Sequence, residues 1–155
     1  MKDFNTTGVC IPEKHYMVNI QGRLDEIRVM VDAGEYFCIN RARQYGKTTT
    51  LAMLKKKLEP EYEVISLDFQ DISVADFKTD GLFVQAFSRM IRNKKRTGLQ
   101  IPEAIDAKLE EYIGRSRDKA NLLDLFTLIS DWCELSEKEL VLIIDEVDSA
   151  SNNQI

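Results

Sequence analysis

The sequence predicts an α/β fold, a parallel sheet with flanking helices, and three observations lead to it. Segments with the composition of strands alternate with segments of helical periodicity along the chain. The run from Leu140 to Ile144 contains no polar residue, which is typical of parallel strands buried on both faces. The turn from Gly46 to Thr48, with the sequence G-K-T, separates a predicted strand from a predicted helix.

The first half of the chain is expected to form helix, strand and helix. Apolar residues recur with helical spacing between Asn19, a candidate N-cap, and Gly34, a natural residue to follow a helix. These apolar positions are Ile20, Leu24, Ile27 and Val31. The segment "EYFCIN", residues 35–40, has the composition of a short strand. Leu51, Leu54 and Leu58 then keep helical spacing until Pro60.

The second half is expected to form strand, three helices and strand. "YEVISLDF", residues 62–69, is rich in β-branched and aromatic residues. A helix should start near Asp80 and end before Gly98, and a second should run from Pro102 to Gly114. A third precedes the apolar strand that begins at Leu140. The predicted inward positions are Leu82, Phe83, Ala86, Phe87, Met90 and Ile91; Ile105, Leu109 and Ile113; and Leu122, Leu125, Phe126, Ile129 and Trp132.

Length and composition predict a single globular domain. The chain has 155 residues, of which 44% are hydrophobic and 30% charged. Its formal net charge of -5 and the lack of a strongly basic half argue against bulk nucleic-acid binding. No signal segment or long apolar run is present, so we expect a cytoplasmic protein without a membrane partner. Cys10, Cys38 and Cys133 are far apart, and the last two are expected to pack in the core.

The stretch "RARQYGKT", Arg41 to Thr48, matches the phosphate-binding pattern G-x-x-x-x-G-K-[ST] except at its first position. In such a loop Gly46 lets the backbone approach the phosphates closely, and Lys47 supplies the cation. Thr48 supplies a hydroxyl for a metal ion. The alternative is an ordinary turn between a strand and a helix with a surface lysine.

The stretch "VLIIDEVD" supplies a second element of a nucleotide site. Parallel strands deliver their carboxyl ends to the same edge of a sheet, so Asp145 and Glu146 are expected beside the phosphate loop. One carboxylate can hold Mg²⁺ and its neighbour can polarise a water molecule. The alternative is a strand that ends in solvated acids. The two elements together, in this chain order, favour the nucleotide site.

The stretches "RARQYGKTT" and "IIDEVD" resemble those of the bacterial AAA-ATPase-like family, whose P-loop commonly reads R-x-R-x-[FY]-G-K-[ST]. An arginine at the first position, here Arg41, is usual in that family. The resemblance implies that residues 1–155 form the N-terminal part of a P-loop NTPase domain of the additional-strand class. In that class a strand later in sequence lies between the P-loop strand and the Walker B strand. The domain would thus be incomplete at its C-terminus, and full-length members often carry a C-terminal nuclease-like domain of the PD-(D/E)XK type.

The resemblance also implies a function and a set of site residues. It implies ATP and Mg²⁺ as cofactors, with hydrolysis expected in the full-length protein and not in residues 1–155 alone. Lys47 and Glu146 would be catalytic, and Thr48 and Asp145 would hold the metal. The nucleotide would contact Arg43, Gln44, Tyr45, Gly46, Lys47, Thr48 and Thr49. The alternatives are a non-hydrolysing nucleotide switch and an interaction module with a vestigial loop. The absence of an N-K-x-D element favours adenine over guanine, and self-association is a further candidate.

Four cations near the end of the helix that starts at Asp80 raise the question of nucleic-acid binding. They are Arg92, Lys94, Lys95 and Arg96. Cations in the last turn of a helix complement the helix dipole and usually stay solvated. We therefore expect a structural role for this cluster, and nucleic acid as a partner only through a C-terminal domain.

Overall fold

The computed structural model describes Asp3 and residues 19–40, 46–115 and 120–147, which form a mixed α/β structure. The contacts divide the chain into two compact units, Met1–Glu61 and Tyr62–Ile155. The α-helices of the described residues are α1 (Gln21–Asp32), α2 (Lys47–Leu58), α3 (Asp80–Asn93), α4 (Glu103–Gly114) and α5 (Leu122–Leu135). The strands are β1 (Glu63–Asp68) and β2 (Leu140–Asp145), and the 3-10 helices are η1 (Phe69–Asp71), η2 (Val74–Phe77) and η3 (Lys94–Thr97).

In the first unit, α1 starts one residue later than predicted, because its N-cap is Ile20 and not Asn19, and it ends where Gly34 predicts. The Asn19 side chain accepts a hydrogen bond from the Gln21 N–H at 3.0 Å. Gly34, with φ of +68°, lies just after the helix in a conformation that favours glycine. Leu24 and Ile27 are buried, as the apolar spacing predicts.

Ion pairs join α1 to α2 and to the residues after it. Asp25 of α1 accepts a hydrogen bond from Lys57 of α2. The Arg28 guanidinium contacts both Asp32 and Glu61. The hydrogen bond from Arg28 lowers the pKa of the Glu61 carboxyl. Because these pairs are solvent-exposed, the buried leucines of the two helices contribute more to the stability of the unit.

The strand predicted for residues 35–40 does not form. These residues adopt neither helix nor strand, and the Tyr36 side chain is fully exposed. A strand needs a neighbour that pairs with its backbone N–H and C=O groups. In the part of the chain that the structure describes, the one sheet consists of β1 and β2. The composition of residues 35–40 was therefore not enough to predict a strand, because strand preference depends on packing against neighbouring strands.

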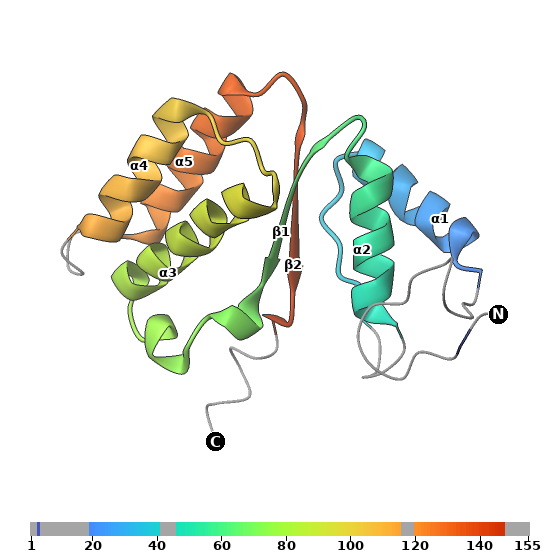
Figure 1. Cartoon of the computed structure of the whole chain (residues 1–155), viewed down its shortest axis with the longest axis horizontal. Coiled ribbons are helices and arrows are strands. Elements are labelled where there is room, and N and C mark those ends of the chain that lie inside the picture. Colours follow the sequence, from blue (N-terminus) through green and yellow to red (C-terminus); the bar gives the residue numbers. More distant parts are fainter. Residues whose placement is uncertain (1–2, 4–18, 41–45, 116–119, 148–155) are drawn as a thin grey trace. The chain divides into compact units, whose positions relative to one another are not determined.

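In the second unit, β1 and β2 form a parallel pair in the register that runs from Glu63 beside Leu140 to Asp68 beside Asp145. Parallel neighbours need a long crossover connection, and α3, α4 and α5 supply it. The three helices lie on the same side of the strand pair (Figure 1). This unit thus confirms the predicted order of strand, helices and strand.

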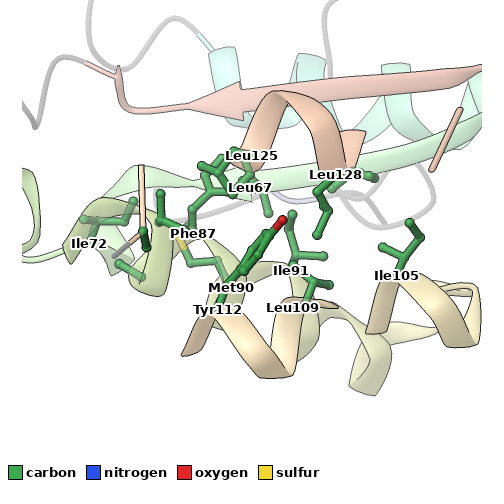
Figure 2. Packing of buried hydrophobic residues seen from close by; sticks show 14 of the residues in the cluster. Leu67, Ile72, Phe87, Met90, Ile91, Ile105, Leu109, Tyr112, Leu125 and Leu128 are labelled. Carbon is green, nitrogen blue, oxygen red and sulfur yellow. The ribbon is translucent and has the colours of Figure 1, made fainter. Parts of the chain in front are cut away.

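The core of the second unit lies between the strand pair and these helices. Figure 2 shows side chains from α3, α4 and α5 converging on Leu67 of β1. Thr79 caps α3, and the reciprocal hydrogen bonds of Asn121 and Asp124 cap α5. The side chains at most 1% exposed in this core are Leu67, Val84, Ile91, Ile105, Leu109, Leu128 and Trp132.

Five positions predicted as buried are exposed, and one of them is Leu122 of α5, which is 38% exposed. Leu142 of β2 is 39% exposed, because β1 is the one neighbour of β2 among the described residues. Phe126 of α5 is 64% exposed, because the buried face of α5 is centred on Leu125, Leu128 and Trp132. Cys38 and Cys133 are also exposed, so the prediction that they pack was wrong.

The two faces of α5 predict different mutational effects. Trp132→Ala removes a side chain that is 0% exposed and should lower the free energy of unfolding by about 3–5 kcal/mol. Phe126→Ala should lower it by less than about 1 kcal/mol, since that ring is mostly in water. Chemical denaturation followed by circular dichroism measures both values. Equal losses in the two variants would contradict the assignment of the buried face.

Candidate functional site

The fixed glycine of the P-loop pattern lies at the start of α2 in a left-handed conformation. Gly46 is the N-cap of α2, with φ of 72° and ψ of 26°. Its carbonyl oxygen accepts hydrogen bonds from the Thr50 N–H at 2.8 Å and from the Thr50 hydroxyl at 2.9 Å. Residues with a side chain are strained at this φ, although there is open space around the Gly46 Cα. The backbone conformation, rather than crowding, therefore requires glycine here.

The first turn of α2 has the features of an anion-binding helix start. No side chain caps it, and it contains no acidic residue. The N–H groups at a helix N-terminus and the helix dipole both favour a negative ligand. Lys47 is half-buried, Thr48 is exposed, and Thr49 and Thr50 are buried. A cation and a hydroxyl thus stand at the end of the helix that attracts phosphate.

The predicted acids lie at the carboxyl end of β2. Asp145 is the last residue of the strand and is 9% exposed. The Glu146 N–H donates a hydrogen bond to the Asp145 carboxylate at 2.8 Å. Glu146 has φ of 55° and is the one non-glycine residue with positive φ in the described ranges. This conformation costs about 1–3 kcal/mol, and such strain is concentrated at functional sites.

Asp68 is a neighbour of these acids that sequence reasoning missed. It ends β1 and lies in register with Asp145, so two aspartates stand side by side at the carboxyl edge of the pair. One Asp68 carboxylate oxygen accepts the Gln70 N–H at 2.9 Å and caps η1. The sequence did contain a signal for Asp68. In "YEVISLDF" a mostly apolar run is followed by an acid, as the apolar run in "VLIIDE" is followed by Asp145.

The predicted site residues fall into two groups, one in each unit. Gly46, Lys47, Thr48 and Thr49 share one turn in the first unit, and Asp145 and Glu146 are adjacent in the second. Arg41, Arg43, Gln44 and Tyr45 lie outside the described residues. Within the described residues, no group of three or more His, Cys, Asp or Glu side chains could hold a metal ion. Mg²⁺ bound by one carboxylate, one hydroxyl, phosphates and water needs no such group.

The cations at the end of α3 interact with α4. Arg92 and Lys95 each donate a hydrogen bond to the Asp106 carboxylate at 2.9 Å, and Arg92 also lies 3.6 Å from Glu110. The hydrogen bonds from Arg92 and then Lys95 lower the pKa of Asp106. These contacts favour a structural role for Arg92 and Lys95 over nucleic-acid binding.

Comparisons with protein-family models, with curated proteins and with solved structures gave no match to this chain. The resemblance to the AAA-ATPase-like family thus remains a prediction that rests on the residues of the two motifs. In the described residues, no helix combines the length and the apolar character that crossing a bilayer requires.

The Asp106 contacts predict a pH-dependent contribution to stability. The pKa of Asp106 is lower in the folded chain than its ordinary value of about 4, so its stabilising effect is present above that pH. At neutral pH, Asp106→Asn should lower the free energy of unfolding by roughly 1 kcal/mol. The difference should shrink as the pH falls below about 4. Asp71→Asn, at an exposed position of η1, is the control, and a loss in Asp106→Asn that does not vary with pH would contradict the assignment.

Proposed function

We propose that this chain is an ATP-binding, Mg²⁺-dependent P-loop domain that hydrolyses ATP in the full-length protein and regulates a C-terminal effector. The observation that carries the proposal is the start of α2. A glycine in the left-handed conformation opens a helix without a side-chain cap, and the next two residues are Lys47 and Thr48. This combination of backbone, cation and hydroxyl is what binding of a polyphosphate requires.

Each site residue has a defined role in this proposal. The backbone N–H groups of residues 43–48 bind the phosphates, and Lys47 neutralises the β- and γ-phosphate oxygens. The Thr48 hydroxyl and the Asp145 carboxylate are oxygen donors of the kind that Mg²⁺ prefers, and they would hold the ion. When bound, the ion supplies positive charge that offsets the charge developing on the phosphates. Glu146 orients the attacking water.

The backbone at Glu146 supports a role in chemistry for this residue. A glutamate in the left-handed region is strained, and a solvated residue after a strand has no reason to keep that strain. Positioning of a carboxylate that must act on a water molecule is a physical reason for such a conformation.

The pairing of the strands is compatible with the additional-strand class. In that arrangement the P-loop strand and the Walker B strand are not neighbours, because a later strand lies between them. Here β2 pairs with β1 and, within the described residues, with no other strand.

The first test is nucleotide binding. Lys47→Ala should weaken binding of a fluorescent ATP analogue with Mg²⁺ by about 10–100-fold, the effect of losing a hydrogen bond to a charged group. Lys56→Ala, which changes an exposed lysine of the same helix, should leave binding unchanged. Fluorescence titration measures both. Equal affinity in the Lys47→Ala variant and the unchanged protein would exclude the proposed phosphate-binding loop.

The second test separates hydrolysis from a nucleotide switch. In single-turnover assays of the full-length protein, Glu146→Gln should slow ATP hydrolysis by about 10²–10⁴-fold while ATP affinity is kept. Glu139→Gln, at an exposed position just before β2, is the control. A rate that does not change in Glu146→Gln would support the switch and contradict hydrolysis by this residue.

A further inference from the structure

Helix α5 has an apolar face that points away from the core. Leu123 is 69% exposed and Phe126 is 64% exposed, while Leu128 and Trp132 of the same helix are fully buried. Ser130 and Cys133 are exposed as well. These four exposed positions, Leu123, Phe126, Ser130 and Cys133, form what we call the outer stripe. A helix of a monomer usually has polar residues on its outer face, so Leu123 and Phe126 make this stripe a candidate contact surface.

The spacing of the outer stripe is that of a helix-packing seam. Its positions are separated by three, four and three residues, which is the a and d pattern of a coiled coil. Leu122, which is 38% exposed, borders the stripe at its start. The two bulky side chains lie in the first half of the helix, and the two small ones lie in the second half. The stripe thus has a gradient of side-chain size along its length.

We propose that the outer stripe is a self-association surface that packs antiparallel against α5 of a second copy of this chain. In this arrangement Leu123 lies opposite Cys133 of the second copy, and Phe126 lies opposite Ser130. Each bulky side chain then meets a small one, so the contact can close without voids or overlap. A parallel arrangement would set bulky residues against each other at one end and leave a gap at the other.

The charges of α5 favour the same direction. Glu134 is exposed in the last turn, which contains no basic residue, so its carboxylate faces the negative end of its own helix dipole. Antiparallel packing brings Glu134 beside the positive N-terminus of the second copy's helix. At that N-terminus the Asp124 carboxylate lies 3.3 Å from Arg115, which balances its charge. Asp131 is likewise paired, with Lys108 of α4.

The expected dimer is weak and depends on concentration. Helix α5 has 14 residues and is about 21 Å long. A contact made by one helix of this length falls below the roughly 1,200 Å² of buried surface that is typical of stable complexes. The inference is independent of nucleotide binding, since every residue of the stripe lies on α5 and none belongs to the proposed ATP site.

Disulfide cross-linking tests the register directly. In a chain with Cys10→Ser and Cys38→Ser, the added substitution Leu123→Cys should give a covalent dimer under mild oxidation, because Cys133 of the second copy lies opposite. Cys133 alone should not cross-link, since the two Cys133 residues would be ten positions apart along the axis, about 15 Å. Non-reducing electrophoresis distinguishes the two outcomes. Cross-linking through Cys133 alone, as fast as with Leu123→Cys, would overturn the antiparallel register.

Sedimentation measures the association without any cross-link. The average mass of the unchanged chain should rise with protein concentration, because an interface below the standard size associates weakly. Phe126→Glu should abolish this rise, and its circular dichroism spectrum should be unchanged because the ring is outside the core. Val74→Glu, which changes an exposed apolar residue of η2, should still associate. A monomer at every concentration, or equal association in both variants, would refute the proposal.

Discussion

The parallel pairing of β1 with β2 is the constraint on which the second unit depends. Two parallel neighbours cannot be joined by a hairpin, so a long connection has to return the chain to the start of the sheet. Here α3, α4 and α5 make that return on one side of the pair (Figure 1). Their apolar faces bury Ile65 and Leu67 of β1. The pairing also fixes the register that sets Asp68 beside Asp145. The same pairing therefore determines the core and the position of the acids.

Elements with local signals were predictable from the sequence. The end of α1 follows from Gly34, and the start of α3 follows from the threonine that precedes Asp80. Residues 35–40 were not predictable in the same way, because a strand exists only when another segment pairs with it. The sequence of α5 was ambiguous for another reason. Apolar residues cover two faces of this helix, and periodicity alone does not say which face meets the core.

The candidate site shows the same division between local and long-range information. The two sequence motifs identified Gly46, Lys47, Asp145 and Glu146. The structure adds that Gly46 is in a left-handed conformation, which explains why the motif has glycine at this position. No sequence pattern indicated the strained backbone at Glu146, since positive φ at a glutamate is set by its surroundings. Asp68 was missed because its position beside Asp145 depends on which strand pairs with β1. Pairing between distant segments is the information that a single sequence supplies least.

One consequence follows from the position of β2 in its sheet. This strand is apolar over five residues, contains neither lysine nor proline, and has one paired neighbour in the described part of the chain. Charged residues and prolines usually protect the edge strand of a sheet against unwanted pairing between molecules. Among the described residues, the second edge of β2 lacks this protection, so there it can accept an incoming strand through main-chain hydrogen bonds. Prolonged heating or storage at high concentration should therefore favour aggregates with added cross-strand structure while the helices are still intact.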